Sequence, residues 1–262
     1  MTHDEYVAFC EAVGASPHTT RLDRTAARSV TAGAGVPVET AEPADLDRWW
    51  VWCGRRRLTP ATRSYYLRAL RRYYRWRHER TGQADPSAQL HALKVPGRLP
   101  RPVPIAAALH TLAAAGGDTQ VMIGLALFAG LRVHEIAALT PDQVRDDGAG
   151  GRYLYIVGKG GRERRVPMVA DLEQLLARYQ WPDVTPAAVT MRVRHALTRH
   201  TGRRYTAHQL RHTFATEVLA GGANLIALQR LLGHVSVQTT QVYADVTVDT
   251  LTDAVRAAFP AA

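Results

Sequence analysis

Two side chains in the last quarter of the chain are spaced to carry out phosphate chemistry. His208 and Arg211 are three residues apart, so on a helix they share one face. An imidazole beside a guanidinium places a proton carrier next to a group that holds phosphate through two parallel hydrogen bonds. Taken alone, the pair is better explained as a surface feature of a basic protein.

The neighbouring histidine raises the possibility of a metal. His208 and His212 have the i, i+4 spacing of the zinc-protease motif His-Glu-x-x-His. The second position of that motif is Gln209 here, so the general base of the chemistry is missing. Arg211 lies between the two histidines and would repel a divalent cation. The sequence offers no other cluster of metal ligands, and we expect no metal site.

Lysine is rare enough in this chain to be informative. Lys94 and Lys159 stand against thirty-one arginines. Lys159 lies in a glycine-rich turn, Gly158-Lys-Gly-Gly161. An ammonium can give up a proton near neutral pH, whereas a guanidinium cannot. The lysine in the turn is therefore a candidate general acid.

Three local patterns would position these residues. The segments 153–157 and 164–168 flank the turn and predict a β-hairpin with Lys159 near its tip. Thr206 and Gln209 predict a capping box that opens a helix carrying both histidines.

A further helix is predicted over 224–232, with Gly233 as its end and His234 just outside it. A short helix then leads to Tyr243. Two helices joined by a glycine turn in a basic protein also fit a helix-turn-helix DNA reader, in which Tyr243 would be a packing aromatic.

Composition limits the class of protein. The chain has 262 residues, with 33 lysines and arginines against 23 acids and a formal net charge of +10. This excess favours a polyanionic partner, either nucleic acid or an anionic membrane. The apolar run 121–131 is too short to span a bilayer, the N-terminus lacks signal-peptide order, and Cys10 and Cys53 cannot form a disulfide framework. We expect a cytoplasmic protein without a membrane partner.

The basic charge is concentrated between Arg48 and Arg80, where eleven arginines accompany a single acid, Glu79. Thr59-Pro60 predicts the start of a helix through this segment. A solvated helix surface normally mixes charges of both signs, and this one does not. We therefore predict that the segment contacts phosphates. The predicted contacts are Arg63, Arg68, Arg71, Arg72 and Arg75.

The prolines divide the chain. Five of them lie between positions 86 and 104 and exclude a continuous helix there. We predict a helical domain over 1–95, a linker over 96–104 and a second domain over 105–262. The second domain is expected to begin with helices over 105–115 and 120–138.

Together these elements resemble the tyrosine recombinase (phage integrase) family. The nine-residue step from His234 to Tyr243 matches, as does the order of all the elements, whereas any one of them would be a weak signal. The matching elements are Gly130-Leu-Arg132-Val-His-Glu135, Lys159, His208-Gln-Leu-Arg211-His212, Leu232-Gly-His234 and Tyr243.

The resemblance implies a mainly α fold: an N-terminal core-DNA-binding helical domain and an α+β catalytic domain that form a C-shaped clamp on double-stranded DNA. Arg132 and Arg211 would hold the scissile phosphate, and His234 would donate to it. Tyr243 would attack phosphorus, leaving a 3′-phosphotyrosyl bond and a free 5′-hydroxyl.

The resemblance also assigns the proton transfers. His208 would handle the tyrosine proton and Lys159 would protonate the leaving 5′-oxygen. Glu135 matches the family's acidic supporting position, and His212 is expected to support the site with it. Because the phosphodiester energy is kept in the tyrosyl bond, no cofactor is implied.

The resemblance also predicts that the protein assembles as a tetramer on DNA. Leu251, Val255 and Phe259 form a stripe suited to docking into a neighbouring protomer of a tetramer on core-type attachment sites; the alternative is that they pack on their own domain.

Other functions left open are a type IB topoisomerase and a non-catalytic DNA-binding regulator. His134 departs from the small polar residue common in the family. The sequence does not separate a phage integrase from a chromosome-dimer resolvase or a transposon recombinase.

Overall fold

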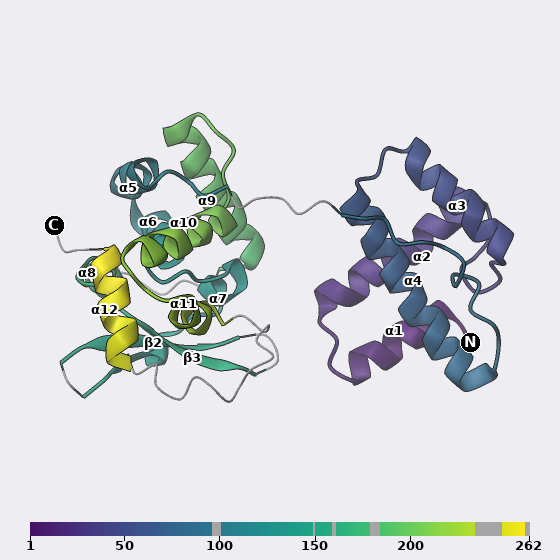
Figure 1. Cartoon of the computed structure of the whole chain (residues 1–262), viewed down its shortest axis with the longest axis horizontal. Coiled ribbons are helices and arrows are strands. Elements are labelled where there is room, and N and C mark those ends of the chain that lie inside the picture. The colour runs from purple at the N-terminus through teal and green to yellow at the C-terminus, as the bar shows by residue number, and fades with distance from the viewer. Residues whose placement is uncertain (96–100, 149, 159–160, 179–183, 234–247, 260–262) are drawn as a thin grey trace. The chain divides into compact units, whose positions relative to one another are not determined.

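The structure is a computed structural model that describes residues 1–95, 101–148, 150–158, 161–178, 184–233 and 248–259. The chain forms two compact units, Met1–Arg98 and Leu99–Ala262, and each is described by itself. Helices dominate both units, and a small sheet lies in the second (Figure 1). The predicted mainly α architecture with a small β element is confirmed. Across the described ranges, no helix is both long and apolar enough to cross a membrane.

The first unit is built from helices that begin at favourable residues. They are α1 (His3–Ala12), α2 (Pro17–Ala34), α3 (Pro43–Arg55) and α4 (Pro60–Thr81). The hydroxyl of Thr59 accepts a hydrogen bond from the backbone N–H of Thr62 at 3.2 Å, and Pro60 follows at the first helical position. The helix predicted to open at Thr59-Pro60 is therefore confirmed as α4.

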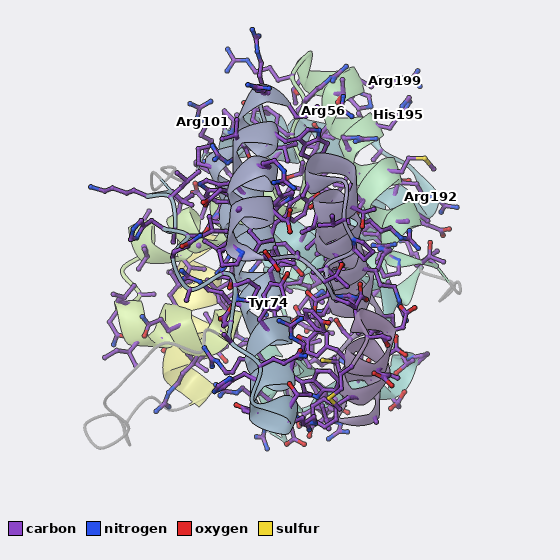
Figure 2. All side chains as sticks on the ribbon, turned by 90° about the vertical axis from the view of Figure 1, so that its right-hand side faces the viewer. Arg56, Tyr74, Arg101, Arg192, His195 and Arg199 are labelled. Carbon is purple, nitrogen blue, oxygen red and sulfur yellow. The ribbon has the colours of Figure 1, made fainter. Side chains whose placement is uncertain are left out.

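Aromatic side chains form much of the core of the first unit. Tyr74 of α4, labelled in Figure 2, is fully buried, and its hydroxyl donates to the carbonyl of Val38 at 2.9 Å. Trp49 of α3 is also fully buried and donates its indole N–H to Ser29 at 3.0 Å. Both aromatic residues lie in the arginine-rich segment between Arg48 and Arg80, so part of that segment forms the core that holds the helices together.

The second unit combines helices with three strands. Its elements are α5 (Ile105–Ala114), α6 (Gly117–Phe128), α7 (Val133–Ala137), the 3-10 helix η1 (Pro141–Gln143), β1 (Val144–Asp146), β2 (Arg152–Val157), β3 (Glu163–Pro167), α8 (Ala170–Ala177), α9 (Pro186–Thr201), α10 (Ala207–Ala220), α11 (Leu225–Leu232) and α12 (Val248–Ala258).

The sheet is antiparallel in the order β1-β2-β3. Tyr153 pairs with Pro167 at one end of β2–β3, and Val157 pairs with Glu163 at the other. Beyond that pair, the N–H of Gly158 donates to the carbonyl of Arg162 at 2.7 Å. The predicted hairpin is therefore confirmed, and β1 is an additional strand that the sequence pattern did not reveal.

Most of the apolar run 121–131 lies in the core helix α6, which ends before the run does. Every residue of α6 from Val121 to Phe128 is buried. The prediction of one helix across 120–138 is wrong, because the chain leaves the helix after Phe128 and starts again as α7. Between them Gly130 has a φ of +60°, a left-handed conformation that glycine adopts without steric cost.

Residues 101–104 belong to the second unit. Val103 is buried in its core, and the hydroxyl of Thr213 donates to the Val103 carbonyl at 2.7 Å. Of the predicted linker 96–104, residues 96–100 lie outside the described residues.

The apolar stripe of α12 packs inside its own unit. Leu251, Val255 and Phe259 are buried in the second core, where the Phe259 ring lies 5.2 Å from that of Phe128. α12 also passes so close to α10 that a Cβ added at Gly221 would lie 2.9 Å from a backbone nitrogen. In the single chain these residues therefore pack on their own domain, which is the alternative stated above, and docking into a neighbouring protomer stays a prediction.

Candidate active site

The loop before α7 presents Arg132 and fixes it to Glu135. One carboxylate oxygen of Glu135, Oε2, accepts the backbone N–H of Arg132 at 2.8 Å, and Oε1 accepts Nη1 of its side chain at 3.1 Å. The Glu135 side chain is 1% exposed, whereas that of Arg132 is 31% exposed. Arg132 is therefore held at its base by a buried anion while part of its guanidinium remains open to solvent.

Arg211 of α10 joins this pair from another part of the chain. It is buried, with Nη1 donating to the carbonyl of Gly130 at 2.5 Å and Nη2 donating to that of Leu232 at 2.6 Å. Its Nη1 also lies 3.8 Å from Oε2 of Glu135. The predicted pair of phosphate-binding arginines, Arg132 and Arg211, therefore converges on one carboxylate.

Glycine at position 130 makes this convergence possible. A Cβ built there would lie 2.5 Å from a ring carbon of Phe214 and 3.1 Å from a methyl carbon of Leu232. Both neighbours are buried core side chains. The close approach brings the Gly130 carbonyl within reach of Arg211.

A third arginine, which follows the glycine-rich turn in the sequence, completes the cluster. Arg164 of β3 donates Nη1 and Nη2 to the two oxygens of Glu135, each at 2.8 Å. Its Nε donates to the carbonyl of Leu231 at 2.8 Å. The sequence signal for it was weak, because alternation in β3 does not reveal which distant carboxylate a side chain reaches.

The charge state of Glu135 follows from these contacts. Burial by itself raises the pKa of this carboxyl, but the hydrogen bonds and charge of Arg164, the N–H of Arg132 and the charge of Arg211 outweigh it and lower the pKa to about 2. Glu135 is therefore ionised at neutral pH. A depressed pKa contributes stability above the ordinary value of 4.5, and this contribution is lost as the pH falls toward 2.

The two histidines of α10 lie against each other. The ring centroids of His208 and His212 are 4.5 Å apart in an edge-to-face arrangement. Burial lowers the pKa of His208 below 6.5, and the charges of His212, Arg211 and Arg132 lower it further. Burial and Arg211 also lower the pKa of His212. The cluster therefore favours a neutral His208 at pH 7, able to accept a proton.

A pocket of about 190 Å³ adjoins Arg132. Its lining includes Arg132, His134, Gly158, Arg164 and Gly233. Gly158 and Gly233 directly precede two residues predicted to be catalytic in the sequence. The residues that directly precede these two predicted catalytic positions therefore line the same pocket as Arg132.

The remaining predicted catalytic residues are Lys159, His234 and Tyr243, and all three lie outside the described residues. Their roles stay predictions. No group of three or more histidine, cysteine or acidic residues placed to hold a metal occurs in the part of the chain that the structure describes.

A larger groove lies away from these residues. It has a volume of about 470 Å³ and runs between the end of α5 and α9, where Arg192, His195 and Arg199 line it (Figure 2). Arg192 is paired with Asp118 at 3.1 Å. None of the predicted site residues lines this groove.

The five arginines of α4 that were predicted to contact DNA fall into two groups. Arg63 packs over the Trp50 ring at 4.2 Å, Arg71 donates to the carbonyl of Leu90, and Arg72 forms an ion pair at 2.6 Å with a buried aspartate. These three have structural partners.

Arg68 and Arg75 are exposed and have no acidic partner among the described residues. Arg68 has one hydrogen bond, from Nε to the carbonyl of Ser64 one turn earlier in the same helix at 3.3 Å. Of the five predicted DNA contacts, these two are therefore the ones with no described contact to another element of the first unit.

The chain is similar to known recombinases along most of its length. The model of the phage integrase family matches residues 183–249. Tyrosine recombinase XerC of Rhodospirillum centenum is 32% identical, with 95% of this chain and 83% of that protein covered. Tyrosine recombinase XerD of Vibrio cholerae is 30% identical, with 79% of this chain and 78% of that protein covered.

Solved structures show the same architecture. The integrase from mycobacterium phage Brujita is 26% identical, with a TM-score of 0.55 over 99% of this chain and 93% of that one. A lambda integrase dimer bound to a COC′ core site has a TM-score of 0.71 at 16% identity, covering 92% of this chain and 97% of that one, and this likeness concerns the fold alone. Because the XerC relative is 32% identical over 95% of this chain, this chain belongs to the tyrosine recombinase family.

Proposed function

We propose that this enzyme is a site-specific DNA recombinase that cleaves and rejoins strands through a 3′-phosphotyrosyl intermediate. The observation that carries the proposal is the convergence of Arg132 and Arg211 on the buried carboxylate of Glu135, near enough to His208 for the charges of both arginines to lower its pKa. Two guanidiniums held by one anion retain a net positive charge. Such a site suits a phosphodiester, whose negative charge increases on the oxygens in the transition state.

The chemistry follows from the residues predicted to meet there. The pKa of a free phenol is ~10, so the Tyr243 hydroxyl needs a base and a positive environment to attack phosphorus. His208 accepts that proton, Lys159 gives one to the leaving 5′-oxygen, and His234 donates to the phosphoryl group. Because the new tyrosyl ester stores the bond energy, rejoining needs no cofactor.

The substrate proposed is double-stranded DNA at core-type sites. Integration or excision of a phage or mobile element is the biological setting we favour, since the Brujita phage integrase is similar over nearly the whole chain. The reaction would take place on the host chromosome in a prokaryotic cytoplasm.

We further infer that four copies assemble on DNA, as in the lambda integrase tetramer bound to a Holliday junction. Docking of Leu251, Val255 and Phe259 into a neighbour would require α12 to leave the core in which it is buried. A tetramer in which α12 stays packed in its own unit would need another contact surface.

Covalent trapping tests the proposed function. A nicked duplex carrying the attachment site should yield a covalent protein–DNA adduct in excess EDTA, because guanidinium and ammonium groups supply the positive charge. Adducts are counted on denaturing gels. A strict metal requirement for cleavage would contradict the mechanism. Relaxation of plasmids that lack any site would instead indicate a topoisomerase, and site binding without cleavage would indicate a regulator.

The pH dependence of cleavage should reflect the lowered pKa of His208. A base with a lowered pKa stays deprotonated until the pH falls below its ordinary value of 6.5. We therefore expect the single-turnover rate to hold as the pH is reduced to 6.5 and to decline only below it. In His208→Gln this acidic limb should disappear from an already slow reaction. A decline that begins well above 6.5 would contradict a neutral His208.

The salt dependence of DNA binding tests the surface of α4. Arg68→Gln combined with Arg75→Gln should reduce the slope of log K against log salt by about 0.9 for each phosphate that is no longer neutralised. Filter binding across a salt series measures the slope. Arg72→Gln is the contrasting variant, because it breaks the ion pair with Asp23 and should lower the melting temperature instead. An unchanged slope in the double variant would show that both arginines are merely solvated.

A further inference from the structure

We propose that Arg164 is a positioning residue of the recombination site, which holds the Arg132 guanidinium ready for the scissile phosphate by occupying the carboxylate of Glu135. The inference rests on the proposed function and assigns a role to a buried arginine that the reaction itself does not use.

Arg164 connects three segments that are far apart in the sequence. Its side chain is 7% exposed, extends from β3 to Glu135 of α7, and reaches the Leu231 carbonyl at the end of α11. The neighbouring carbonyl, that of Leu232, accepts from Arg211. Two arginines therefore hold consecutive carbonyls at the negative end of α11 while both face the same carboxylate.

Competition for Glu135 explains how Arg164 would act on Arg132. Arg164 contacts both oxygens of Glu135 at 2.8 Å, whereas the Arg132 side chain has one hydrogen bond to it at 3.1 Å. A paired, parallel contact is the strongest geometry between a guanidinium and a carboxylate. With Arg164 in that place, the Arg132 side chain is tethered to Glu135 by one donor, and its other donors have no hydrogen-bond partner among the described residues. Without Arg164, Arg132 would turn toward the carboxylate and away from the phosphate.

Lysine cannot replace arginine here. The contacts of Arg164 use three nitrogens in a fixed plane, two for Glu135 and one for Leu231. An ammonium has a single nitrogen and would keep the charge but lose the planar, paired contact. Arg164→Lys therefore separates geometry from charge.

The neighbouring residue provides the matched control. Arg165 is exposed on the same strand, with its guanidinium 5.1 Å from the centre of the Tyr153 ring. Arg165→Lys makes the same chemical change one residue away, on the other face of β3. The two variants have equal net charge, so any difference between them in cleavage arises from the contacts of Arg164.

The experiment measures DNA affinity and single-turnover cleavage of a nicked site at saturating protein. Arg164→Lys should lower the cleavage rate on the order of 100-fold, the loss typical of an ångström-scale misplacement, with unchanged affinity. Arg165→Lys should match the unmutated enzyme. Equal rates in the two variants, or loss of affinity and melting temperature together with cleavage, would overturn the positioning role.

Two further measurements identify the route. In a Glu135→Gln background Arg164→Lys should have a much smaller additional effect, because the shared carboxylate is gone; full additivity would contradict the proposal. A substrate with sulfur as the bridging 5′ atom needs no general acid. The cleavage rate of Arg164→Lys should therefore stay low on this substrate. Restoration would assign Arg164 to the hairpin lysine instead and overturn a route through Arg132. If the unmutated enzyme forms no adduct at all, the proposed function fails and this inference fails with it, whereas normal adduct formation with equal rates in Arg164→Lys and Arg165→Lys overturns this inference alone.

Discussion

Replacing Tyr243 with phenylalanine is expected to abolish covalent protein–DNA adducts completely while DNA affinity is unchanged. The substitution removes one hydroxyl oxygen, and no other group can form the phosphotyrosyl ester at that place. Denaturing gels of a nicked-site reaction measure the adduct, and peptide mapping of the unmutated adduct should locate it on Tyr243.

Tyr155→Phe is the matched control for that variant. It makes the same change on β2, where the ring packs under Arg145 at 4.0 Å, and it should cleave normally. Persistent adducts in Tyr243→Phe would assign the nucleophile elsewhere and remove the basis of the proposed mechanism.

The second large effect concerns Lys159. Lys159→Ala should slow cleavage of normal DNA by about 10²–10⁴-fold, the range for losing a general acid. On a substrate with a bridging 5′ sulfur the same variant should approach the unmutated rate, because the thiolate leaves without a proton. Lys159→Arg should stay slow on normal DNA, since a guanidinium steadies charge but hardly transfers a proton.

The scarcity of lysine gives this experiment a clean control. Lys94 is the other lysine of the chain, and Lys94→Ala should leave both substrates unaffected. Rapid-quench kinetics on the two substrates measures the ratio of rates for each variant. Equal impairment of Lys159→Ala on both substrates would make Lys159 a phosphate-binding residue and require another source for the proton.

Much of the fold was predictable because the signals are local. The capping residues Thr59 and Thr206, and the turn beginning at Gly158, specify their elements within a few positions along the chain. The break between α6 and α7 was missed, because apolar periodicity continues past Gly130, and the contact with Phe214 that requires glycine there is distant in the sequence.

The residues of the candidate site were likewise predictable only where the signal is local in the sequence. Spacing and order indicated Arg132, His208 and Arg211, but no local pattern pairs Arg164 with Glu135 across 29 positions. The same holds for Arg72, which the sequence analysis assigned to DNA and which the structure pairs with a buried aspartate 49 positions away. Long-range ion pairs depend on the packed fold, so charge runs alone do not separate structural arginines from binding ones.

The bend at Gly130 also limits how the gene can vary. Any other amino acid would bring a Cβ into contact with Phe214 and force a side chain into the left-handed backbone region. The carbonyl of the same residue anchors Arg211, so relieving the clash by moving the backbone would withdraw a partner from the site. Every amino-acid-changing mutation at this codon therefore carries both penalties.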